Sequence, residues 1–190
     1  MVLAYRPDAR QAGVTLVEMV IVVAVLAVAA SLAIPKADSI SPAVADAAAG
    51  EVARALRFAQ REAIRNDKYY RVEFNTATQK LRVYPMMTWG VVMEDWGTTV
   101  RHPVNKNTYE VNFSANPTMR STIVSAVFKY DGTTRSYASF GPDGTPADIH
   151  GWAAKDVDPL GENGTITIRH GNAERVVSVA PVTGRVSVSP

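Results

Sequence analysis

The fold of this chain is decided by residues 14–34, which read VTLVEMVIVVAVLAVAASLAI. Thr15, Glu18 and Ser31 are the only polar side chains in this stretch. A helix rises about 1.5 Å per residue, so a helix of this length spans about 30 Å, which is the hydrocarbon thickness of a bilayer. We therefore predict one membrane-spanning helix at residues 14–35, with a separate domain after it.

Glu18 places a carboxylate in the first turn of this apolar helix, and that position needs a reason. An ion inside a membrane helix costs about 2.5–3.5 kcal/mol, and less near the interface. One reason is capping, because Thr15 and Glu18 fit the capping-box spacing and the positive end of the helix dipole favours a carboxylate. The other is an ion pair with an α-amino group created by cleavage after Gly13. The two explanations are compatible.

The positions of Gly13, Val14, Glu18 and Pro35 relative to one another resemble the signal of a known family. A Gly, an apolar residue, Thr, Leu, Val and Glu, then a long apolar run and a Pro, resemble the class III signal of type IV pilins and pseudopilins. In this comparison Gly13 precedes the cleavage point, Val14 is the new N-terminus, Glu18 is the fifth mature residue and Pro35 the twenty-second.

The resemblance implies how the segment is processed and used. A prepilin peptidase would cleave after Gly13 on the cytoplasmic side and methylate the new amine of Val14. Glu18 would pair with the N-terminus of a neighbouring subunit during assembly. Val14 stands where the family usually has Phe, so the extent of its methylation stays open.

Two other interpretations of this segment compete. Ala45-Asp46-Ala47 resembles the cleavage site of a secretory signal peptide, but the apolar run exceeds the 7–15 residues typical of such signals and contains Glu18. An ordinary membrane anchor does not explain why Gly13, Glu18 and Pro35 occur together.

Composition bounds the rest of the chain. Its 190 residues hold one membrane helix and one soluble domain with its own core, and the absence of cysteine excludes disulfides and thiol chemistry. Residues 1–13 contain two arginines and one aspartate, so the remainder carries 18 basic and 17 acidic side chains. This balance does not indicate nucleic-acid binding. Arg6 and Arg10 precede the apolar run, which places the leader in the cytoplasm and the domain beyond the inner membrane.

The chain then divides into four parts. Residues 1–13 are a leader, 14–35 the membrane and filament-core helix, 36–67 an amphipathic continuation of the helix, and 68–190 an antiparallel β domain. The apolar stripe of the second helix, widened by Phe58 and Ile64, recurs every three or four residues at Ala48, Val52, Leu56, Ala59 and Ala63.

The opposite side of this helix is charged. Four arginines recur at helical spacing, interleaved with Glu51 and Glu62: Arg54, Arg57, Arg61 and Arg65. Such a ridge either binds a polyanion or is a solvated helix face, and the solvated face is the commoner case.

After Tyr69 the apolar period changes to two, which is typical of strands. Gly, Pro, Asn and Asp mark the turns, with hairpin signals at 131–132 and 141–144. We interpret residues 145–163 as a loop. The predicted strands are 70–75, 80–84, 109–113, 123–130, 135–140, 165–169, 175–179 and 185–188.

The predicted class is therefore α+β, with a long N-terminal helix on antiparallel sheet. Three later segments resemble the GspH/FimT family of minor pseudopilins and minor pilins, which has a type IV pilin-like fold. They are Ala59–Asn66 (AQREAIRN), Phe140–Gly144 (FGPDG) and the terminal Gly184-Arg185.

Motifs for other chemistry are weak. His102, His150 and His170 lack the spacing of a metal site, and Asp156, Asp158 and Glu162 indicate an acidic loop rather than a calcium site. The chain has no G-x-S-x-G and no phosphate-binding glycine loop, so we predict no enzyme, no cofactor and no metal. Three tryptophans are candidates for core packing or for a docking surface: Trp89, Trp96 and Trp152.

Arginines near the C-terminus bear on nucleic acid. FimT-like competence pilins bind DNA through a terminal G-R-x-R pair, but Ser187 occupies the second position here. Arg169, Arg175 and Arg185 are nevertheless candidates for contacts with phosphates.

The sequence thus predicts a minor pseudopilin, a single-pass inner-membrane subunit of a type II secretion pseudopilus with its domain in the periplasm. Its expected partners are prepilin peptidase, other pilins or pseudopilins in the filament, and secreted cargo or DNA. The alternative is a minor pilin of a type IV pilus, including one that binds DNA during uptake. An anchored hydrolase or receptor would need a pocket that the sequence does not indicate.

Overall fold

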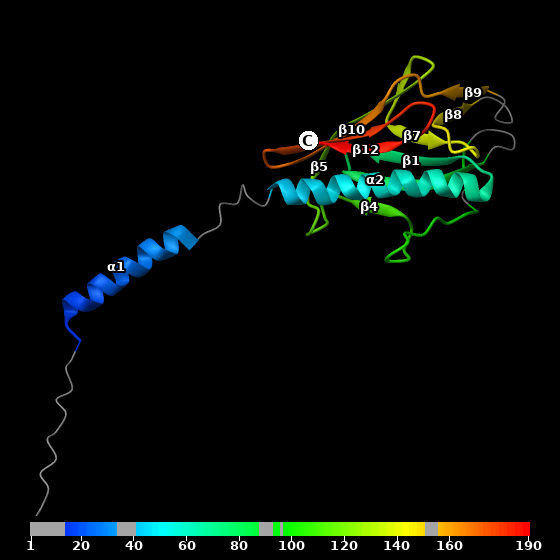
Figure 1. Ribbon diagram of the computed structural model, residues 1–190. Coiled ribbons are helices and arrows are strands. Elements are labelled where there is room, and N and C mark those ends of the chain that lie inside the picture. The colour runs from blue at the N-terminus through cyan, green and yellow to red at the C-terminus, as the bar shows by residue number, and fades with distance from the viewer. Residues whose placement is uncertain (1–13, 34–40, 88–92, 96, 151–155) are drawn as a thin grey trace, which may run out of the picture. The chain divides into compact units, whose positions relative to one another are not determined.

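The computed structural model describes residues 14–33, 41–87, 93–95, 97–150 and 156–190. The chain divides into two compact units, Met1–Ala37 and Asp38–Pro190. The first contains helix α1 (Leu16–Ala33), and the second contains helix α2 (Ser41–Asn66) and all the strands (Figure 1). The predicted boundaries at 13 and 35 lie outside the described residues.

Helix α2 forms from an alanine-rich sequence with high helix propensity, and it buries the predicted stripe. Ala48, Val52, Leu56, Ala59 and Ala63 are all 0 % exposed, which confirms the period. Two details of that prediction are wrong. Ile64 is 55 % exposed and does not widen the buried stripe, because its side chain points about 100° around the helix from that of Ala63. Glu51, expected on the solvated side, is buried because the loop bearing His102 and Tyr109 covers it.

The strands form two five-stranded antiparallel sheets. In the first, the order is β3-β2-β1-β7 with β4 also paired to β2, and in the second it is β12-β11-β10-β5-β6. The strands of the first sheet are β1 (Tyr70–Asn75), β2 (Lys80–Met87), β3 (Met93–Glu94), β4 (Glu110–Asn112) and β7 (Tyr137–Phe140). Those of the second are β5 (Thr122–Tyr130), β6 (Thr133–Arg135), β10 (Gly164–His170), β11 (Ala173–Val179) and β12 (Val186–Ser189).

Residues 145–163, predicted as a loop, include two short antiparallel strands instead. Strand β8 (Ala147–His150) pairs with β9 (Asp156–Pro159), and Ile149 faces Val157 in the register. The sequence pattern concealed these strands because Asp148, a residue disfavoured in strands, lies in the buried part of β8. Its burial depends on a partner from another strand, described below.

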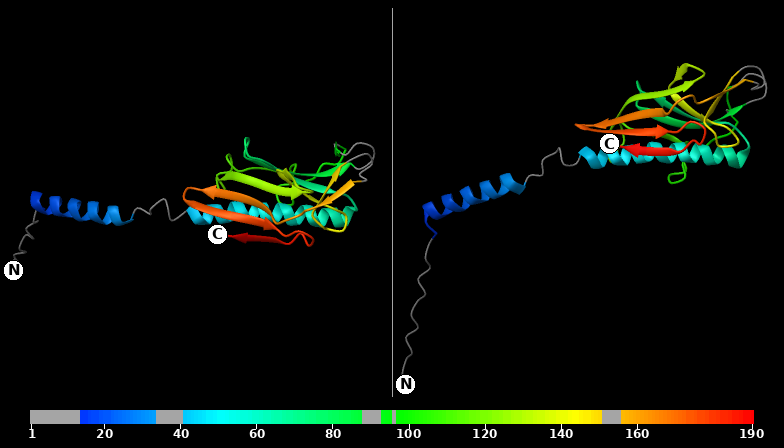
Figure 2. Two further views of the ribbon diagram at one scale, coloured as in Figure 1. Left: turned by 90° about the horizontal axis from the view of Figure 1, so that it is seen from above. Right: turned by 45° about the horizontal axis from the view of Figure 1, so that its top comes forward.

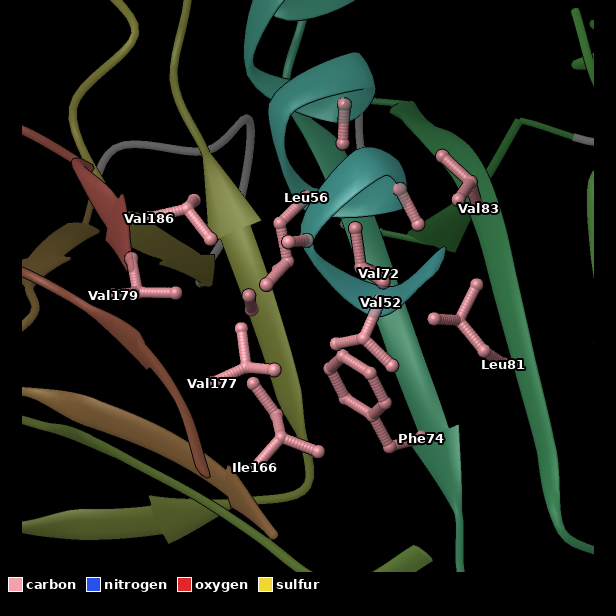
Figure 3. Packing of buried hydrophobic residues seen from close by; sticks show 14 of the residues in the cluster. Val52, Leu56, Val72, Phe74, Leu81, Val83, Ile166, Val177, Val179 and Val186 are labelled. Atoms are coloured by element: carbon pink, nitrogen blue, oxygen red, sulfur yellow. The ribbon is translucent and has the colours of Figure 1, made fainter. Parts of the chain in front are cut away.

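The core lies where α2 meets both sheets. Figure 3 shows Val52 and Leu56 of α2 between Leu81 of β2 on one side and Val177 of β11 on the other. The right-hand view in Figure 2 shows α2 running along one side of the strands. One helix therefore joins the two sheets, and the α+β class predicted from the sequence is confirmed.

Candidate functional site

Helix α1 has a surface poorly suited to water. Apolar side chains are exposed at consecutive positions, and consecutive positions point in directions about 100° apart around a helix. A helix that is apolar all round is normally covered by lipid or by other helices. Side chains at least 55 % exposed include Val14, Leu16, Val17, Met19, Val20, Ile21, Val23, Val25, Leu26 and Val28.

The start of α1 bears on the two explanations for Glu18. The Glu18 backbone N–H donates a hydrogen bond to Thr15 Oγ1 at 3.2 Å, and the Met19 N–H donates to the Thr15 carbonyl at 3.2 Å. Thr15 therefore caps the helix, as predicted. Glu18 is exposed in the first turn, and its pairing with a neighbouring amine stays a prediction.

The other residues predicted for processing and assembly are only partly visible. Val14 is described and 66 % exposed. Gly13 and Pro35 lie outside the described residues. Over the described part of the chain, no helix has both the length and the apolar composition that a membrane crossing requires.

The second unit brings together the three segments that resemble the GspH/FimT pattern. Gln60, in the first of them, donates from Nε2 to the Gly144 carbonyl at 2.8 Å and to the Thr183 carbonyl at 3.1 Å. One side-chain amide on α2 therefore joins the Phe140–Gly144 turn to the turn before β12. We call this arrangement the Gln60 bridge. The sequence contains Gln60 within its motif, but no pattern assigns it this role.

Two glycines let the two turns of the Gln60 bridge approach the Gln60 side chain. Gly144 has φ +81° and Gly184 has φ +63°, a region that side chains other than glycine rarely adopt. A Cβ on Gly184 would lie 2.5 Å from Gln60 Nε2 and 3.0 Å from the Gly144 carbonyl oxygen. Both the backbone conformation and the close approach therefore require glycine at position 184.

Asp143 organises the first of these turns. Its Oδ1 accepts hydrogen bonds from the Thr145 N–H at 3.0 Å and from the Thr145 hydroxyl at 2.8 Å. These bonds stabilise the carboxylate and hold the pKa of Asp143 below its usual value. These hydrogen bonds close the turn in which the Gly144 carbonyl accepts from Gln60.

The three arginines predicted to contact nucleic acid do not form one cluster. Arg169 pairs with Glu174 at 2.7 Å, and Arg175 pairs with Asp46 of α2. Arg175 shares the helix-facing side of its sheet with Val177, whereas Arg169 alternates with the buried positions of β10 and faces the other side. Arg185 lies opposite Ala180, about 16 Å along β11 from Arg175 at about 3.3 Å per residue. Their contact with nucleic acid stays a prediction.

The histidines and the acidic segment are also separate. His102 lies 3.1 Å from Glu51, and His150 lies 2.7 Å from Asp158. Among the described residues, no group of three or more His, Asp or Glu side chains is arranged to hold a metal ion. Trp89, Trp96 and Trp152 lie outside the described residues, so their predicted packing or docking is not visible.

A buried ionic network, absent from the sequence analysis, anchors the β8–β9 pair of strands. Asp148 is 3 % exposed and accepts from Arg71 at 2.7 Å and from the Tyr137 hydroxyl at 2.6 Å. The Arg71 guanidinium also lies over the Tyr137 ring, 3.9 Å from its centroid. Burial, with Asp148 as acceptor, raises the pKa of Tyr137 to about 12. Because these residues are distant in sequence, no local pattern reveals the network.

Comparisons with known proteins agree with the sequence motifs. The family model for the type II transport protein GspH matches residues 48–183, and the prokaryotic N-terminal methylation motif matches residues 8–34. No curated protein matches the chain in sequence.

Two solved structures are similar to parts of the chain. The minor pseudopilin EpsH from the type 2 secretion system of Vibrio cholerae has 13 % identity and a TM-score of 0.46, covering 76 % of this chain and 95 % of that one. The type IV minor pilin FimU of Pseudomonas aeruginosa has 16 % identity and a TM-score of 0.41, covering 76 % and 92 %.

Proposed function

The chain belongs to the GspH family of type II transport proteins, and on this basis we propose that it is a minor pseudopilin of a type II secretion system. The observation that carries the proposal is the order of the two matches, a methylation motif at residues 8–34 followed by the GspH region at 48–183. The protein would act as a structural subunit rather than as a catalyst.

We propose that residues 14–35, the apolar run that contains α1 and extends beyond the described residues, act first as a membrane anchor and then as a filament core. The exposed apolar side chains of α1 support both roles, because lipid and neighbouring helices are equally apolar surroundings. Prepilin peptidase would cleave after Gly13 at the inner membrane, leaving the domain on the periplasmic side. Glu18 would then pair with the amine of a neighbouring subunit, where a low dielectric strengthens the attraction.

Two substitutions separate processing from assembly. We expect Gly13→Ala to block cleavage, because the peptidase would lose the residue before the cut. We expect Glu18→Ala to be cleaved normally but to enter filaments poorly. Cleavage is read from the mass of the purified chain, and incorporation from co-purification with sheared filaments. Wild-type cleavage of Gly13→Ala would contradict the proposed processing.

The secretion role is tested by the proteome of the culture medium. A strain lacking this protein should retain a set of exported proteins in the periplasm, and the complemented strain should release them. Unchanged export would refute the secretion role. Loss of pili or of DNA uptake in the same strain would then favour a minor pilin.

A further inference from the structure

We propose that the domain contains a binding site for a phosphate-class anion in a cavity beside the turn between β10 and β11. The cavity has a volume of ≈ 310 Å³, within the range of small-molecule sites. Its wall combines two arginines and a histidine with three hydroxyl side chains, and the arginines with the Ser121 and Thr122 hydroxyls are donors suited to phosphate oxygens, whereas the Ser114 hydroxyl donates to Asn112 Oδ1 at 2.8 Å. The arginines, the histidine and the hydroxyl residues are Arg120, Arg169, His170, Ser114, Ser121 and Thr122.

Arg120 supplies the unneutralised charge. Within the described residues its guanidinium forms no ion pair and is exposed. Arg169 is close by, because it pairs in register with Thr122 of β5, but Glu174 shares its charge. A guanidinium forms paired hydrogen bonds with phosphate oxygens, so Arg120 is the residue free to bind an anion.

His170 fixes the geometry of this wall. Its Nδ1 donates a hydrogen bond to the Arg120 carbonyl, which ties the end of β10 to the segment before β5. Since Nδ1 carries the proton in that bond, Nε2 is the nitrogen left available.

The Ser121 hydroxyl in the cavity wall is a buried donor without an acceptor among the described residues. The side chain of Ser121 is 6 % exposed, and in the described structure its Oγ has no hydrogen-bond partner. Buried hydroxyl groups are nearly always paired, and an unpaired one is destabilising. A bound oxyanion would provide the acceptor that this hydroxyl lacks.

The position of the cavity suggests a source for the anion. A Cβ on Gly171 would lie 2.7 Å from Ser41 Oγ, so the β10–β11 turn packs against the first residue of α2. Only residues 34–40 separate Ser41 from the end of α1. If α1 is held in the membrane, as the proposed function requires, the cavity lies at the tethered end of the domain. A lipid headgroup phosphate and a free phosphate share the required chemistry.

Inorganic phosphate is the first probe. The full chain in neutral detergent is titrated with phosphate against chloride at equal ionic strength, and the amide resonances of Ser121 and Gly171 are followed. We expect saturable shifts in the wild type and about tenfold weaker binding in Arg120→Gln, from the loss of a charge-assisted pair. Arg61→Gln is the matched control, because Arg61 is an exposed arginine that does not line this cavity.

Ser121→Ala provides a second test that does not depend on charge. It should weaken phosphate binding without lowering the urea midpoint, because it removes a hydroxyl that has no partner in the free protein. Shifts that are linear in phosphate, or equal in Arg120→Gln and Arg61→Gln, would overturn the proposal.

The source is distinguished with lipid nanodiscs. The full chain is placed in phosphatidylcholine alone or with phosphatidylglycerol, and hydrogen exchange is measured at residues 120–122 and 169–171. Protection that needs phosphatidylglycerol and disappears in Arg120→Gln supports the headgroup as ligand. Saturable phosphate binding with exchange independent of lipid supports a free phosphate.

Failure of this proposal is separable from failure of the proposed function. A chain that is cleaved after Gly13 and restores secretion, yet shows neither saturable phosphate shifts nor lipid-dependent protection, refutes only the anion site. A chain that binds phosphate but is not cleaved refutes only the proposed processing.

Discussion

The Gln60 bridge makes a quantitative prediction about two residues that are far apart in sequence. Gln60→Ala removes two hydrogen bonds to backbone carbonyls, each worth about 1 kcal/mol net, so the free energy of unfolding should fall by about 2 kcal/mol. Gly184→Ala adds about 1–2 kcal/mol of backbone strain at φ +63°. Its Cβ also displaces the Gln60 amide, so the same two bonds are lost and the total cost is about 3–4 kcal/mol.

The double variant tests whether these two costs share a cause. In Gln60→Ala the amide that a Cβ on Gly184 would displace is absent, so adding Gly184→Ala should cost the backbone strain and the 3.0 Å contact with the Gly144 carbonyl oxygen, but no further hydrogen bonds. The double variant should therefore lose about 3–4 kcal/mol, about 2 kcal/mol less than the sum of the single variants.

Urea unfolding of the full chain in neutral detergent, followed by near-ultraviolet circular dichroism, measures the three values. A third single variant, Arg61→Ala, serves as a control for an exposed position on the same helix and should change stability by less than about 0.5 kcal/mol. Additivity of the two single variants within about 0.5 kcal/mol would refute the bridge as the cause of their effects.

Three further predictions concern the buried polar groups. Asp148→Ala should lower the free energy of unfolding by about 3–5 kcal/mol, because it leaves Arg71 charged and unpaired in a buried site; a loss below about 1 kcal/mol in urea would contradict this. Raising the pH above 10 should destabilise the domain progressively toward pH 12, because the pKa of Tyr137 is raised to about 12 in the folded domain and the tyrosine of the unfolded chain ionises at a lower pH. Urea midpoints that stay constant from pH 9 to 12 would contradict the burial of this phenol. Glu51→Ala should cost about 2 kcal/mol and increase hydrogen exchange near His102, because it removes the carboxylate that holds that loop to α2; unchanged exchange there would show that other contacts hold the loop.

The parts of the fold that follow a local period were predictable. Ala48 to Ala63 recur at helical spacing, and a stripe of that kind has one way to be buried, against the rest of the domain. Turns were also predictable where backbone conformation selects the residue. Asp131 and Gly132 have φ of +44° and +75°, as the hairpin signal Asp-Gly requires.

The parts that depend on distant partners were not predictable. Asp148 is buried in a strand where Arg71 and the Tyr137 hydroxyl partner it, and Glu51 is buried beneath the loop bearing His102. In each case the local sequence favours exposure, and the tertiary contact overrides it. The family resemblance identified Gly184, but its structural reason, the approach of the Gln60 amide, requires the fold.

The contacts between α2 and the C-terminal residues determine when the domain can finish folding during its synthesis. Arg57 and Gln60 of α2 donate to the carbonyls of Val186 and Thr183, across 129 and 123 residues of chain. Contacts of such long range form slowly, since most of the chain must be brought together before they can exist. During translation, α1 and α2 therefore emerge long before the residues that complete the packing of α2. A nascent chain would reach its membrane machinery with the domain still unfolded, and a truncation that removes residues 183–186 would leave α2 without its last partners.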